Sequence, residues 1–238
     1  MRKDLEEIKP FWQSQADKEM KLQRQIHVCQ LVIDMFENND KDIEGRRRCI
    51  NAGIPTALAQ LYEKQDDIFI KQQHIDAFFY IGVYEVNIIG QLLFSKYLFG
   101  GLLRILQHPD NSITFRGIQC IFNIIVAGSN INLSPQVLHP YFDSIGGHSG
   151  IKRLYEFFNK WNQYECSKNT ASICIGNLCR ARMIEDETIR KNIIAHLKKI
   201  INDTDKWTRD SSRFALQYLA SNSVNKAEIT KDGFAVPK

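Results

Sequence analysis

The sequence predicts an all-α protein built from repeated helical units, and three observations support this fold class. Apolar residues recur at helical spacing, as in 113–126, where residues 118, 121, 122 and 125 are Ile, Ile, Phe and Ile. No segment shows the sustained alternation of apolar and polar residues that indicates a strand. Apolar segments of one plan also return along the chain with a period of roughly 40–45 residues, which is typical of helical repeats.

Each repeat is expected to hold a shorter helix, a polar hinge and a longer helix. The shorter helices are predicted at 53–64, 100–108, 150–161 and 192–203, and the residues that match among them, Leu58, Leu103, Leu154 and Leu197, lie 45, 51 and 43 residues apart. The longer helices are predicted at 70–84, 113–128, 165–181 and 207–222. The hinges contain Asp, Asn and Pro residues, which end one helix and cap the next.

One interval is too long, and it locates an insertion. Aligning Tyr80, Asn123, Asn177 and Tyr218 in the longer helices gives steps of 43, 54 and 41 residues. The extra residues of the middle step fall in 131–149, which is rich in Pro and Gly. We therefore expect 131–149 to form a loop on the surface, between two regular repeats. A further helix is expected near the C-terminus, at 225–234.

Composition is ordinary for a globular protein and excludes some classes of function. The 238 residues are 44% hydrophobic and 24% charged, with a net charge of +4, well short of the charge of a dedicated nucleic-acid binder. Six cysteines without CxxC pairs favour a reducing, cytoplasmic location, with the nucleus as the alternative. The charged N-terminus predicts no secretory signal, and the polar residues within the apolar region 88–106 predict a core helix rather than a membrane span.

Several segments resemble the armadillo repeat. The stretch RRRCINAGIPTALAQLYEKQDD (46–67) is similar to its first two helices, and CIFNIIVAG (120–128), CIGNLCRA (174–181) and FALQYLASN (214–222) are similar to the end of its third. The resemblance implies a right-handed α-solenoid superhelix of about four armadillo-like repeats plus N-terminal helices. It assigns 1–41 to an N-terminal helical cap or partial repeat and 42–238 to the repeat domain. The related HEAT repeat, built from helix pairs, is the alternative.

The resemblance also implies a concave groove, lined by the third helices, that binds an extended segment of a partner protein. Ile173, Cys174 and Leu178 are expected to point inward, Gly176 to allow close helix approach, and Asn177 to face the groove. Importin-α-like members carry a Trp one turn before each groove Asn, and this chain has no such ladder, which argues against recognition of nuclear localisation signals. The predicted groove residues, counting the positions one turn before Asn123, Asn177 and Tyr218, are Tyr80, Gln119, Asn123, Ile173, Asn177, Phe214 and Tyr218.

No pattern in the sequence predicts chemistry. The six histidines lack metal-ligand spacing, the glycines of 144–150 lack the Lys-Ser/Thr of a P-loop, and neither a catalytic residue nor a cofactor is expected. The Arg run at 46–48 is expected to be a solvated helix face. We therefore predict a non-enzymatic module that binds a protein or peptide. The alternatives are a basic solenoid that contacts nucleic acid or an anionic surface, and a regulatory armadillo region of a larger protein.

Overall fold

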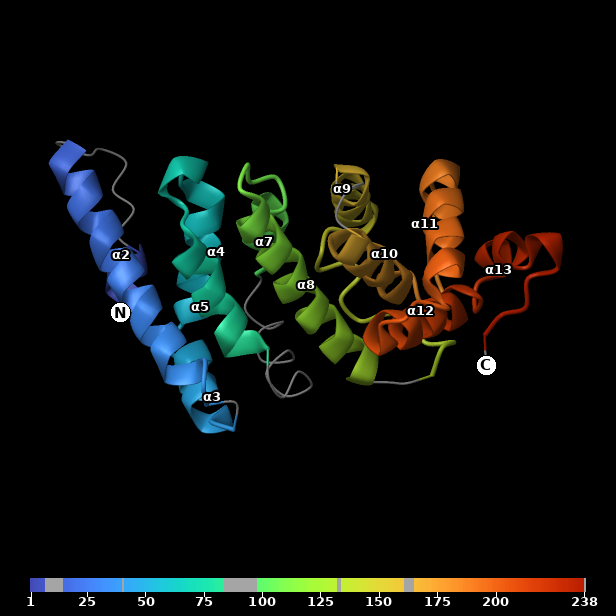
Figure 1. Cartoon of the computed structure of the whole chain (residues 1–238), viewed down its shortest axis with the longest axis horizontal. Coiled ribbons are helices and arrows are strands. Elements are labelled where there is room, and N and C mark those ends of the chain that lie inside the picture. The colour runs from blue at the N-terminus through green and yellow to red at the C-terminus, as the bar shows by residue number, and fades with distance from the viewer. Residues whose placement is uncertain (7–14, 40, 84–97, 132–133, 161–164, 238) are drawn as a thin grey trace. The chain divides into compact units, whose positions relative to one another are not determined.

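The structure is a computed structural model that describes residues 1–6, 15–39, 41–83, 98–131, 134–160 and 165–237 (Figure 1). These residues form helices joined by turns, and none of them is in a strand. The all-α fold class is therefore confirmed. The chain forms two compact units, unit 1 from Met1 to Ala127 and unit 2 from Gly128 to Lys238, which are described separately below.

Unit 1 is made of two layers of helices. One layer holds α1 (Arg2–Glu6), α4 (Ile54–Lys64) and α7 (Phe99–Ile105), in which α4 contacts both of the others. The second layer holds α2 (Gln15–Phe36), α5 (Gln72–Gly82) and the part of α8 (Asn111–Ile131) that ends at Ala127; α2 packs along α5 (Figure 1). The short helices α3 (Ile43–Asn51) and η1 (Asp67–Phe69) join these layers.

Helix α4 shows why the repeat folds as its sequence predicts. Gly53 precedes the helix with a left-handed φ of 80°, which suits glycine, and Pro55 stands in the first turn, where no backbone donor is needed. Leu58, Leu61 and Tyr62 then form a fully buried stripe at helical spacing. The shorter helix predicted at 53–64 is thus confirmed.

The N-terminal segment packs as part of unit 1. Helix α1 contacts α4, and α2 contacts α5, so these two helices take the places of a second and a third helix preceding the first full repeat. The predicted boundary between 1–41 and 42–238 does not coincide with the division between the compact units, which follows Ala127.

Unit 2 is built from helix pairs. Helix α10 (Glu165–Leu178) packs against α9 (Gly147–Lys160), α11 (Glu187–Ile200) and α12 (Lys206–Leu219), and α11 also contacts α12 and α13 (Ser223–Ile229). Residues 179–186 connect α10 to α11 by turns without an intervening helix. The helix expected at 225–234 is instead α13, capped by Asn222, followed by the turn η2 (Lys231–Gly233).

The insertion is only partly a surface loop. Residues 134–146 form turns, and Val137 and Leu138 are exposed as expected. Tyr141, Phe142 and Ile145 are buried instead, and the Tyr141 ring lies so close to Gly128 that a Cβ there would come within 2.6 Å of it. The expectation of a surface loop is therefore wrong for Tyr141, Phe142 and Ile145, because their apolar side chains join the core of unit 2.

Two apolar regions bear on the question of a membrane span. The apolar region 88–106 is described only from residue 98, where α7 is largely buried. Helix α8 is long and apolar enough by composition to cross a membrane, but 61% of its most apolar window is buried inside the protein, which is usual for a core helix.

Candidate partner-binding surface

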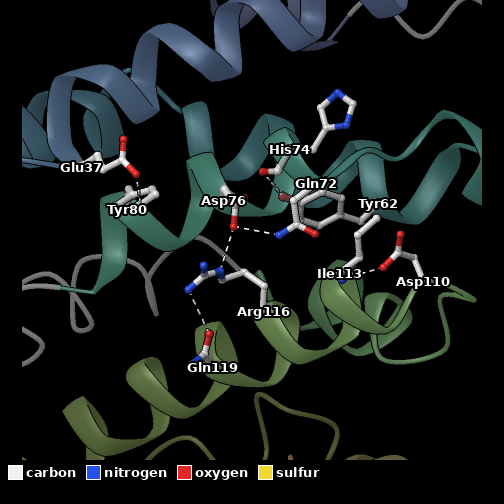
Figure 2. Close-up of polar contacts among 10 residues, drawn as sticks. All are labelled: Glu37, Tyr62, Gln72, His74, Asp76, Tyr80, Asp110, Ile113, Arg116 and Gln119. Atoms are coloured by element: carbon white, nitrogen blue, oxygen red, sulfur yellow. Dashed lines mark hydrogen bonds and ion pairs between the residues drawn. The ribbon is translucent and has the colours of Figure 1, made fainter.

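Polar and aromatic side chains gather on one face of the third helices of unit 1 (Figure 2). Asp76 and Tyr80 lie one turn apart on α5, and Gln119 and Asn123 lie one turn apart on α8, at the positions that the repeat alignment matches to them. All four side chains are partly exposed. Three of the seven predicted groove residues, Tyr80, Gln119 and Asn123, therefore lie on adjacent helices of one unit and remain accessible.

Arg116 links the two helices. Its Nε lies 2.8 Å from Asp76 Oδ1, and its Nη1 donates to Gln119 Oε1 at 3.1 Å (Figure 2). Gln72 donates from Nε2 to the same Asp76 oxygen at 2.9 Å. The guanidinium carbon also lies 4.0 Å from the centre of the Phe79 ring, within the range of a cation–π interaction.

Tyr80 is fixed from the side of α2. Its hydroxyl donates to Glu37 Oε1 at 3.1 Å, and its ring meets the Phe79 ring edge-on at 5.6 Å. Partial burial and the hydrogen bond to Glu37 both raise the pKa of the Tyr80 hydroxyl, so it stays a neutral donor. The surface thus offers a neutral phenol, two carboxamides on α8 and the ion pair of Asp76 and Arg116.

In unit 2, the structure contradicts the predicted groove orientation of Asn177. Its side chain is 5% exposed, donates from Nδ2 to the Ile173 carbonyl oxygen at 2.8 Å, and accepts from Ser129 Oγ at 2.9 Å. Ile173 is fully buried, and Tyr218 is buried with the Arg180 guanidinium carbon 5.2 Å from its ring centre. These three side chains are therefore not accessible to a partner; Ser129 lies against Asn177, and Arg180 lies over Tyr218.

The inward-facing predictions for α10 are confirmed. Ile173, Cys174 and Leu178 are fully buried. A Cβ at Gly176 would lie 2.6 Å from the Cβ of Ala215 on α12, so only a residue without a side chain permits this approach.

Helix α12 carries an exposed aromatic stripe. Phe214 is 55% exposed, as a groove residue requires, and Trp207, two turns earlier on the same face, is 40% exposed. Sequence reasoning missed Trp207, although its spacing of seven residues from Phe214 on a predicted helix was available as a signal.

The Arg run at 46–48 does not form a solvated basic face. Arg46 is completely buried and donates to backbone carbonyls, whereas Arg47 and Arg48 lie beside Glu44 in exposed ion pairs. The run therefore supplies no cluster of three exposed cations for a phosphate backbone. Within the described segments, no group of three or more His, Cys, Asp or Glu side chains is placed to hold a metal ion.

Comparison with known proteins supports the fold. No protein-family model matches the chain, and no curated protein sequence matches it. A designed armadillo repeat protein in complex with the peptide (KR)4 is 14% identical, with a TM-score of 0.58, and the match covers 98% of this chain and 86% of that one. A computationally designed armadillo repeat protein for modular peptide recognition is 15% identical, with a TM-score of 0.60 and the same coverage.

At such low identity these matches establish the fold alone. The chain has an armadillo-type α-solenoid fold, as its resemblance to that repeat predicts.

Proposed function

We propose that this chain is a non-enzymatic module that binds an extended segment of a partner protein along its third helices. The observation that carries the proposal is the accessible face of α5 and α8. The matched residues Tyr80 and Asn123 of consecutive third helices are partly exposed there, and Gln119 lies one turn before Asn123. The designed proteins of similar fold support it, since one is in complex with a peptide and another is made for modular peptide recognition.

The chemistry of this face suits an extended backbone. The carboxamides of Gln119 and Asn123 can each donate and accept, which matches the alternating N–H and C=O groups of a peptide in extended form. Tyr80 adds an aromatic ring beside them, and such rings contribute contact area at low entropic cost. The exposed Trp207 and Phe214 of unit 2 offer a second, apolar contact region for a partner.

The cellular setting belongs to the proposal as well. All six cysteines are free thiols and five of them are buried, which fits a reducing compartment such as the cytoplasm.

The proposal is tested by comparing two variants in one capture assay. Gln119→Ala with Asn123→Ala removes both carboxamides of the face, and Gln60→Ala with Gln107→Ala removes two exposed carboxamides elsewhere in unit 1. Partners captured from the native cell by the wild type are then titrated against each variant. We expect the first variant to bind at least one partner about 1–3 kcal/mol more weakly and the control to bind normally.

Melting temperature is measured on the same samples, because exposed polar-to-Ala changes should cost no more than about 0.5 kcal/mol of stability. Equal affinity of the wild type and the first variant for every captured partner would contradict the proposed binding face. Affinity that falls steeply with added salt would favour nucleic acid or another polyanion instead.

A further inference from the structure

The guanidinium of Arg116 is held in a small cage. Asp76 supplies a carboxylate oxygen at 2.8 Å, Gln119 a carbonyl oxygen at 3.1 Å, and Phe79 a ring face centred 4.0 Å from the guanidinium carbon. Only 27% of the Arg116 side chain and 19% of the Asp76 side chain are exposed. These three contacts recognise a planar cation by charge, by hydrogen bonding and by stacking at once.

Packing of the repeats does not account for an arginine at this position. In the alignment that matches Tyr80, Asn123, Asn177 and Tyr218, position 116 corresponds to Gln73, Thr170 and Ser211 in the other third helices. Short or neutral side chains therefore suffice at this point of the repeat, and the arginine is particular to α8.

We propose that Arg116 is a specificity-determining residue that fills a cation subsite of the partner-binding surface and closes it to arginine-bearing segments. This inference rests on the proposed function, since it concerns the same face of α5 and α8. An arginine from a partner has to displace Arg116 before it reaches Asp76 and Phe79, so one guanidinium replaces another and the exchange gains no contacts. Without the Arg116 side chain, the carboxylate and the ring are open to a guanidinium from outside.

The test uses the basic peptide (KR)4, the ligand of one designed protein of similar fold, as a fluorescent probe. Binding is compared among the wild type, Arg116→Ala, Arg116→Ala with Asp76→Asn, and Arg48→Ala. The last is a matched control, because it removes one exposed positive charge from unit 1 away from the cage. We expect Arg116→Ala to bind the peptide about ten-fold more tightly than both the wild type and the control, equivalent to about 1.4 kcal/mol.

The gain has to depend on the cage. Asp76→Asn in the Arg116→Ala background is expected to return the affinity to that of Arg48→Ala. If Arg116→Ala binds no more tightly than Arg48→Ala, or if its gain survives Asp76→Asn, the inference is overturned.

A second readout keeps the inference testable if Arg116→Ala folds poorly. Free ethylguanidinium should raise the melting temperature of Arg116→Ala, and of the milder Arg116→Gln, more than it raises that of Arg116→Ala with Asp76→Asn. Equal effects on these variants would show that no guanidinium site exists and would refute the inference.

The two proposals fail in different ways. The proposed function fails when Asn123 and Gln119 substitutions leave capture of native partners unchanged. The inference about Arg116 fails in the (KR)4 and ethylguanidinium experiments, neither of which requires a native partner.

Discussion

Replacing Arg46 should destabilise unit 1 more than any other single change on its helix α3. The side chain is fully buried and donates hydrogen bonds to the C-terminal ends of both α2 and α5. Its Nε donates to the Tyr80 carbonyl at the end of α5 at 3.1 Å, and its Nη2 donates to the Phe36 carbonyl at the end of α2 at 3.4 Å. Nη1 donates to the carbonyls of Asn39 at 2.9 Å and Asp42 at 3.2 Å.

The magnitude follows from what the substitution leaves behind. Arg46→Ala removes the guanidinium donor from four carbonyl oxygens, and each lost hydrogen bond costs about 1 kcal/mol. The carbonyls of Phe36 and Asp42 each keep one backbone N–H donor, whereas the substitution removes the side-chain donor of Asn39 and Tyr80. The positive charge at two helix C-termini and the contact of the guanidinium with the Phe36 ring, 4.7 Å away, are lost as well. Relief from burying a charge offsets part of this sum, so we expect a loss of about 3–5 kcal/mol.

Urea unfolding followed by circular dichroism measures the change, and hydrogen exchange locates it. Protection should fall at the C-terminal turns of α2 and α5, while α11 and α12 of unit 2 keep theirs. Arg46→Lys retains the charge but not the planar fork, and should lose about half as much as the alanine variant. Arg47→Ala, at an exposed ion pair with Glu44, is the control and should change stability by no more than about 0.5 kcal/mol. A loss below about 1 kcal/mol for Arg46→Ala would refute the reasoning.

Three further predictions concern single positions. Asn177→Ala should lower the free energy of unfolding by about 1–3 kcal/mol, because it leaves the Ser129 hydroxyl without its acceptor, whereas Asn123→Ala should lower it by less than about 0.5 kcal/mol. Equal melting temperatures of the two variants would contradict the difference in burial. Gly176→Ala should lower the melting temperature, since the cost of overpacking, about 1–3 kcal/mol, exceeds the gain in helix propensity, about 1 kcal/mol. Adding Ala215→Gly to this variant should restore the melting temperature. A rise in melting temperature for Gly176→Ala would disprove the close contact. Burial lowers the pKa of His74 and of His196 from 6.5 to about 4, so the unfolded chain binds protons that the folded chain does not, and the free energy of unfolding should fall as pH drops from 6.5 towards 4. Urea titrations should show a weaker pH dependence for His74→Gln and an unchanged one for His27→Gln, which lies at an exposed site. Equal pH profiles of the two variants would count against the assignment.

The repeat plan was predictable because it depends on local signals. Gly53 and Pro55 mark the start of α4, and Asp205, in the predicted hinge before 207–222, caps α12. The start of α11 was predicted less well, because its cap, Asp186, lies before the range 192–203 in which that helix was expected. Such signals act within a few residues of the position they determine, so a single sequence is enough to read them.

The depth of a side chain was harder to predict, because it depends on residues far along the chain. Asn177 and Asn123 occupy the same register of the repeat, yet only Asn177 meets a distant partner, Ser129, 48 residues earlier. The burial of Arg46, in contrast, could have been predicted from the spacing of residues on α3, although a solvated face was expected there. Arg46 precedes the buried Cys49 and Ile50 by three and four residues, which places it on the apolar face of α3.

The insertion 131–149 has an exposed part and a partly buried part, and only the exposed part should tolerate added sequence. The side chains of residues 136–138 are all exposed, the polar Gln136 as well as the apolar Val137 and Leu138. The Tyr141 ring, in contrast, lies against Gly128 of α8. An epitope tag or a reporter spliced in after Gln136 would extend a turn that already faces solvent. Excision of the whole of 131–149, meant to make the repeats uniform, would instead remove the cover of α8 at its C-terminal end.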